Sequence, residues 1–143
     1  MGRHDENAAL ASRLWTAVAE SDPDTLRKFL APRAVWRAYG ANPLSGEYRG
    51  ADGVIEYLAS VGDLVDRLRL SLHGIFANDD GAIIDLHVSA QRGERRLEVD
   101  FLLTLRIADG EVVEARTVAV DQLANDAFWT GAPLGSAGPP ALD

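Results

Sequence analysis

Apolar residues in the first part of the chain recur at the spacing of an α-helix. Between residues 5 and 20 they lie three and four positions apart, which predicts a helix whose buried face is formed by Leu10, Leu14, Ala17 and Val18. The segment Ser21–Asp24 then combines an N-cap residue with a proline at the first helical position, which predicts a second, short helix that ends near Pro32. Helical spacing returns over residues 50–65 and predicts a third helix.

The pattern elsewhere is typical of β-strands. Residues 34–39 are rich in β-forming side chains, and segment 40–50 has the glycine, asparagine and proline content of a loop. Apolar and polar residues alternate over residues 68–72 and again over 84–88, which predicts strands with one buried and one polar face.

Two more strands are expected over residues 94–107 and 111–120, each preceded by a two-residue turn, Arg92–Gly93 and Asp109–Gly110. Pairing across the first turn puts like residues opposite each other: Leu86 with Val99, Val88 with Leu97, His87 with Glu98, and Asp85 with Asp100.

This order of elements excludes Rossmann and barrel folds, in which strands and helices alternate. It predicts an α+β fold in which a curved antiparallel sheet forms a cone around three N-terminal helices, with a ligand pocket at the mouth of the cone. We expect residues 1–130 to form a single domain and residues 131–143, which are rich in glycine and proline, to be a flexible tail.

The composition excludes some classes of function. The chain has 143 residues, no cysteine and a formal net charge of -8, which argues against nucleic acid as a partner. The N-terminus lacks the apolar region of a signal peptide, and no apolar run is long enough to span a bilayer. We therefore expect a cytoplasmic protein that neither enters a membrane nor binds nucleic acid.

Three segments carry a resemblance to a known family. They are SDPDTLRKFLAPRAVW, SGEYRGADGVIEYL and LRIADGEVVEARTVAVDQ. In sequence and order they resemble the nuclear-transport-factor-2-like superfamily, in particular the SnoaL-like polyketide cyclases and ketosteroid-isomerase-like proteins. The resemblance implies a cystatin-like cone, association into a homodimer, and a cofactor-independent isomerase, cyclase or dehydratase acting on a hydrophobic oxygenated metabolite such as a polyketide or terpenoid.

The resemblance also indicates which chemistry does not carry over. The catalytic positions of the steroid isomerases fall near Leu14, Ala38 and Leu103, which are all apolar. Asp85 matches the first carboxylate of the epoxide hydrolases by position, but no arginine lies two residues before it. Epoxide hydrolysis is therefore kept only as an alternative, beside a non-catalytic dimer that binds a small ligand.

By the same resemblance, Asp121 matches the acid/base aspartate of the SnoaL-like cyclases. Burial at the pocket floor would raise the pKa of such a carboxylate towards the range useful in catalysis. The alternative is that Asp121 caps a short helix over residues 122–127. Arg116 is the catalytic candidate that would polarise a substrate oxygen, and Tyr39 or Asn42 could stabilise the developing oxyanion in its place. The alternative for Arg116 is a partly exposed ion pair with Glu114.

The candidate substrate-binding residues combine aromatic, apolar and amide side chains: Trp36, Tyr39, Asn42, Tyr57, Phe101, Leu103 and Trp129. Trp36 matches the pocket-facing tryptophan of the resembling family, and ordinary core packing is the alternative for each aromatic residue. Ala115, Thr117 and Ala119 would line the pocket instead of Arg116 if a β-bulge reverses the face of their strand.

No metal site and no cofactor are expected. His73 and His87 fall on the polar phase of their strands, towards solvent or a subunit partner. Asp85, His87, Glu98 and Asp100 could together hold a cation, but a solvated or interfacial polar face is the favoured interpretation.

Overall fold

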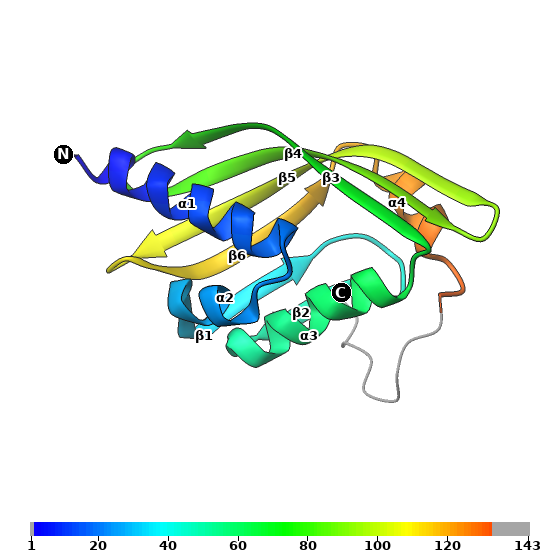
Figure 1. Ribbon diagram of the computed structural model, residues 1–143, viewed down its shortest axis with the longest axis horizontal. Helices are drawn as coiled ribbons and strands as arrows, with labels where there is room; N and C mark the ends of the chain where they lie inside the picture. Colours follow the sequence, from blue (N-terminus) through cyan, green and yellow to red (C-terminus); the bar gives the residue numbers. More distant parts are fainter. Residues whose placement is uncertain (1, 133–143) are drawn as a thin grey trace.

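The computed structural model describes residues 2–132, and in this range the chain forms one six-stranded sheet and four helices (Figure 1). In chain order the elements are α1 (Arg3–Ala19), α2 (Pro23–Phe29), β1 (Leu30–Ala38), β2 (Gly46–Arg49), α3 (Gly50–Asp63), β3 (Arg67–Ala77), β4 (Gly81–Arg92), β5 (Arg95–Ala108), β6 (Glu111–Ala119) and α4 (Gln122–Trp129). The helices α1, α2 and α3 lie against one face of the curved sheet, and α4 follows the last strand at one end of it (Figure 1). The predicted α+β fold class is confirmed.

The strand order is β2-β1-β6-β5-β4-β3. Strands β1 and β6 pair in parallel, whereas the other neighbouring strands are antiparallel, as predicted for β3 to β6. Strand β2 lies within the segment that was expected to be a loop, and it pairs with β1 so that Tyr48 lies opposite Trp36. A strand of only four residues is too short to show an alternation of apolar and polar positions, so the sequence pattern did not predict this edge strand.

The turn between β4 and β5 differs from the prediction by one position. Arg92 pairs with Arg95, so the two-residue turn is Gly93–Glu94 rather than Arg92–Gly93. Gly93 takes a φ of 62° at the first turn position, where a hairpin turn favours glycine. The shift moves every partner by two residues, so Leu86 faces Phe101 instead of Val99, and each side chain keeps its predicted face.

The second hairpin follows the prediction at its turn and departs from it within the strand. Asp109 and Gly110, with φ of 53° and 76°, form the turn. Pairing then shifts by one residue between Ile107 opposite Val112 and Arg106 opposite Glu114, which leaves Val113 as a bulged residue. The bulge reverses the face of the rest of β6, so the alternative that Thr117 faces the concave side is the one observed.

The core lies between the sheet and the three N-terminal helices. Helix α1 packs on β3 and β4, and α2 and α3 pack on β1. Helix α2 begins as predicted: Asp22 accepts a hydrogen bond from the backbone N–H of Thr25 (3.2 Å), and Pro23 occupies the first turn. The largest fully buried side chains are Trp36, Leu14, Ile84, Leu97, Val54 and Val112.

Residues 133–143 of the predicted tail lie outside the described residues. Within residues 2–132, no helix combines the length and the apolar character needed to cross a membrane.

Candidate ligand-binding site

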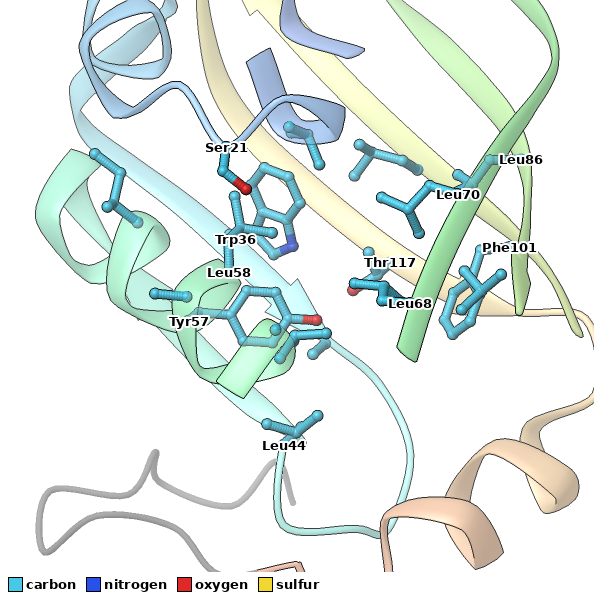
Figure 2. Close-up of a pocket in the computed structure, with 18 of the residues that line it drawn as sticks. Ser21, Trp36, Leu44, Tyr57, Leu58, Leu68, Leu70, Leu86, Phe101 and Thr117 are labelled. Carbon is cyan, nitrogen blue, oxygen red and sulfur yellow. The ribbon is translucent and has the colours of Figure 1, made fainter. Parts of the chain in front are cut away.

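A cavity of about 360 Å³ lies between the concave face of the sheet and the helices. This volume is at the lower end of the range for small-molecule pockets. Every layer of the fold contributes to the wall (Figure 2). The main contributors are Trp15 and Val18 of α1; Trp36 and Ala38 of β1; Ile55, Tyr57 and Leu58 of α3; Leu68 and Leu70 of β3; Leu86 and Val88 of β4; Leu97, Phe101 and Leu103 of β5; and Thr117 of β6.

The cavity exists because the first helix covers only part of the sheet. The N-terminal end of α1 is held at the turn between β3 and β4, where the Asn7 amide donates to the carbonyl of Asn78 (2.9 Å). The alternation of β3 nevertheless continues to place Leu68 and Leu70 on the concave face, at the other end of the strand. These leucines stay partly exposed, since no helix covers them there.

Several polar groups interrupt the apolar wall, and three of them converge. The hydroxyls of Tyr57 and Thr117 and the indole nitrogen of Trp36 all point into the same part of the cavity (Figure 2). The Nε1 atom of Trp36 is buried and has no hydrogen-bond partner in the protein. Thr117 donates to the carbonyl of Arg37 (3.2 Å), which leaves its oxygen free to accept.

Burial raises the pKa of the Tyr57 hydroxyl, and the nearby Thr117 hydroxyl offsets part of that rise. Tyr57 is partly buried and lies on the cavity wall. Its ring packs on that of Tyr48, with centroids 4.2 Å apart, and the Tyr48 hydroxyl donates to the carbonyl of Leu44. The Tyr57 ring is therefore fixed by packing. Its phenol is neutral at physiological pH and can donate or accept a hydrogen bond.

No aspartate, glutamate, histidine, lysine or arginine belongs to the cavity wall in the described part of the chain. An ionised ligand buried here would lose its hydration without gaining an opposite charge, which costs several kcal/mol or more. The electrostatics of the site therefore favour a neutral ligand.

The predicted wall residues all lie on this cavity: Trp36, Tyr39, Asn42, Tyr57, Phe101, Leu103 and Trp129. Two of them already have polar partners. Trp129 donates from Nε1 to Asn125 (3.0 Å), and the Asn42 amide donates to Asp126 (2.7 Å) while its oxygen accepts from the Leu44 N–H (2.9 Å). Asn42 therefore holds its own loop in place, and its amide is not free for the oxyanion-stabilising role predicted for it.

Asp121 does not lie on the cavity wall. It is the N-cap of α4, and its carboxylate accepts a hydrogen bond from the backbone N–H of Ala124 (3.0 Å). Strand β6 ends at Ala119, so the chain has already turned outwards when it reaches Asp121, which is exposed. The capping alternative considered for Asp121 is the arrangement observed.

Arg116 also lies outside the cavity, because the bulge at Val113 turns it to the convex face opposite Thr104. There it bonds Glu114 (2.7 Å), which also accepts from Arg37 (3.0 Å). Burial alone would raise the pKa of Glu114, but the two arginines together hold it below its usual value. The ion pair considered for Arg116 is therefore observed, as part of a longer network. Asp85, the residue behind the epoxide-hydrolase alternative, lies outside the wall as well.

Sequence reasoning missed the anchor of the loop at the cavity mouth. Asp126 of α4 accepts hydrogen bonds from the backbone N–H of Ala41 (3.1 Å), from Asn42 (2.7 Å) and from Gln122 (2.9 Å). The only available signal was the sequence Asn42-Pro43-Leu44-Ser45, which is typical of a side-chain-stabilised turn. Nothing in that signal indicates a partner more than 80 residues away.

Comparison with known proteins agrees with this architecture. Bal32a, from a soil-derived mobile gene cassette, is 25% identical with a TM-score of 0.84 and aligns over 90% of this chain and 99% of its own. A protein of unknown function with a cystatin-like fold from Xanthomonas campestris is 29% identical, with a TM-score of 0.78 over 91% and 99% of the two chains. TerC, co-crystallised with polyporic acid, is 16% identical with a TM-score of 0.75 and aligns over 86% of this chain and 97% of its own.

A search of curated protein sequences finds no significant match. The model of the SnoaL-like domain, in contrast, matches residues 11–115, which span α1 to β6 and most of the cavity wall. The chain therefore belongs to the SnoaL-like domain family.

Proposed function

We propose that the protein binds a neutral, predominantly apolar small molecule that carries a carbonyl oxygen, and that this oxygen accepts hydrogen bonds from Trp36 and Tyr57. The unpartnered Nε1 of Trp36 is the observation that carries the proposal. An indole N–H is a donor only, and a buried donor without a partner costs about 1–3 kcal/mol. An acceptor oxygen on the ligand would remove that cost.

The rest of the wall sets the remaining character of the ligand. Flat apolar area from Trp36, Phe101 and the leucines of β3 favours a ring system over a flexible chain. The missing charges favour a neutral molecule over a carboxylate or an amine. TerC, which shares the fold, was crystallised with an organic compound, polyporic acid, and this agrees with a small-molecule role.

The proposal does not include general acid/base catalysis by Asp121, because that carboxylate caps α4 away from the cavity wall. It does not include a role for Arg116 in polarising the substrate, because Glu114 holds the guanidinium on the other face of the sheet. Association into a homodimer, implied by the family resemblance, stays a prediction.

The convergence of two donors favours a second candidate, an isomerase or cyclase acting on the same kind of ketone. Donors aimed at one oxygen would stabilise the enolate formed when a base from solvent takes an α-proton of that ketone, since no carboxylate or imidazole of the described residues lies on the cavity wall. Exchange of the α-protons of a bound ketone in heavy water, followed by NMR, tests this candidate. Exchange that is accelerated by the protein and slowed by Tyr57→Phe would support an enzyme, and exchange at the rate of the free ketone would reject it.

Binding itself is tested with three probes of one shape. These are 2-acetylnaphthalene, its hydrocarbon isostere 2-isopropylnaphthalene, and the anion 2-naphthoate, each titrated calorimetrically. We expect the ketone to bind about 25-fold more tightly than the hydrocarbon, since its oxygen accepts two neutral hydrogen bonds that each contribute roughly 1 kcal/mol, and the anion not to bind. Equal affinity for ketone and hydrocarbon, or tighter binding of the anion, would overturn the proposal.

A further inference from the structure

Three side chains on the convex face of the sheet form a cluster that the cavity does not use. His73 of β3, His87 of β4 and Asp100 of β5 come from three adjacent strands, and one ligand atom from each lies within 4.8 Å of the others. The Oδ1 atom of Asp100 is 3.3 Å from Nε2 of His73 and 2.8 Å from Nδ1 of His87. The sequence pattern placed all three on the polar face but did not bring His73 to Asp100.

The sheet geometry explains how His73 reaches this cluster. His87 pairs directly with Asp100 across β4 and β5, while Ser71 is the residue opposite His87 on β3. A register shift between Leu72 and Gly74 makes His73 an extra residue of β3. Bulges redirect side chains in this way, and here the imidazole lies diagonally over the pair formed by His87 and Asp100.

These distances fit the coordination shell of a metal ion. Nitrogen and oxygen ligands about 2.0–2.1 Å from a tetrahedral zinc ion lie roughly 3.3 Å from one another. The two separations from Asp100, 3.3 and 2.8 Å, are close to this value. Two imidazoles and one carboxylate leave a fourth position open for water, and imidazole ligands suit zinc, copper and nickel better than magnesium or calcium.

A second carboxylate occupies the position that supports a metal-bound histidine. The Nε2 atom of His87 is 2.7 Å from Glu98, so a metal at Nδ1 would leave the other ring nitrogen donating to that carboxylate. Such a partner fixes the ring and its tautomer in many metal sites. Ser89 in turn donates to Glu98 (2.7 Å) and holds it in place.

The cluster is open to solvent on one side. The side chains of His73, His87 and Asp100 are 50%, 32% and 49% exposed. An ion can therefore enter without rearrangement of the sheet, and replacing one ligand does not disturb the core.

We propose that His73, His87 and Asp100 bind a Zn²⁺ ion, with Glu98 orienting His87, at a site on the convex face that is separate from the cavity. The competing account is a hydrogen-bonded cluster without metal. In that state the hydrogen bonds from His87 to Glu98 and Asp100 raise the pKa of the imidazole.

The chain has only three histidines, which makes the test direct. Long-range ¹H–¹⁵N spectra of the untagged, full-length, chelator-treated protein resolve the three imidazoles during titration with Zn²⁺. We expect the ring signals of His73 and His87 to shift together and saturate at one equivalent. Those of His4, in the first turn of α1, should stay unchanged. Signals that do not move, or a shift of His4 alone, would overturn the site.

Variants give an independent measurement. His73→Ala and Asp100→Asn should each weaken calorimetric Zn²⁺ binding by about tenfold or more, with His4→Ala as the matched control. Glu98→Gln should cause a smaller loss, because it removes an orienting group rather than a ligand. If His73→Ala or Asp100→Asn binds Zn²⁺ as tightly as the unaltered chain, the proposal is wrong. If a variant does not fold, the histidine signals of the unaltered protein still decide the question.

Discussion

The rings of Trp36 and Tyr57 lie with their centroids 6.3 Å apart, and the polar atoms of both point into the same part of one apolar cavity. One residue comes from the first strand and the other from the third helix, so the fold brings together two donors that are 21 positions apart in sequence. A ligand oxygen placed between them would accept from both, and the first prediction concerns this pair.

Tyr57→Phe is expected to reduce the affinity for 2-acetylnaphthalene about fivefold and to leave the affinity for 2-isopropylnaphthalene unchanged, because it removes one neutral hydrogen bond and little apolar area. Isothermal titration calorimetry measures both. Tyr48→Phe is the matched control, since the Tyr48 hydroxyl donates to the carbonyl of Leu44 and is not on the cavity wall. If both variants lose the same affinity for the ketone, the Tyr57 hydroxyl does not donate to the ketone oxygen.

Asp121 provides a test of capping against catalysis. Asp121→Ala should lower the free energy of unfolding by about 1 kcal/mol, whereas Asp121→Asn should nearly retain it, because asparagine caps helices as well as aspartate does. Urea unfolding measures this difference. We expect both variants to bind the ketone normally, and a loss of ligand binding in Asp121→Asn with unchanged stability would contradict the assignment.

Glu114 should matter more for stability than its neighbour Arg116. Glu114 accepts from both Arg37 and Arg116 and is 23% exposed, whereas Arg116 is 45% exposed and has one partner. Glu114→Gln should cost about 1 kcal/mol of unfolding free energy, and Arg116→Gln roughly 0.5 kcal/mol or less. Comparable losses in urea unfolding, or a larger loss for Arg116→Gln, would show that the network is not centred on Glu114.

Asp126 predicts a dependence of stability on pH. Burial alone would raise the pKa of Asp126, but the hydrogen bonds from Asn42, Gln122 and the Ala41 N–H together lower it below its usual value. A carboxyl whose pKa is lower in the folded chain than in the unfolded chain contributes stability above the unfolded value, and this contribution is lost as the pH falls through the folded value.

The stability contributed by Asp126 should therefore decline below about pH 4. Asp126→Asn should be less stable than the unaltered protein at neutral pH, and the difference should shrink as the pH falls towards about 3. Urea unfolding at several pH values measures it. A difference in stability that stays constant across this pH range would show that the charge of Asp126 does not stabilise the fold.

The sequence was sufficient where one pattern determined the answer. The alternation around Leu86 and Val88 fixed which face of β4 is buried, and the two-residue error in its pairing did not change that face. The family resemblance implied that the side chain of Trp36 faces the pocket, and Trp36 lies on the cavity wall.

The rest depended on interactions that a local pattern does not encode. The bulge at Val113 decides whether Arg116 or Thr117 faces the cavity. The sequence of β6 is consistent with either orientation of the strand. Whether Asp121 faces the cavity or caps α4 depends on where β6 ends, and strand boundaries are the least predictable feature of a sequence. The diagonal approach of His73 to Asp100 likewise depends on a register shift.

The indole N–H of Trp36 reports on the central claim most directly. The chain has three tryptophans, and a ¹H–¹⁵N spectrum gives one indole signal for each, with Trp129 as an internal control because its Nε1 already donates to Asn125. On addition of 2-acetylnaphthalene the Trp36 indole proton should move further downfield than on addition of 2-isopropylnaphthalene, because only the ketone supplies an acceptor. The Trp129 signal, whose donor is already bonded, should respond alike to both probes. A Trp36 signal that responds equally to the ketone and the hydrocarbon would contradict the account.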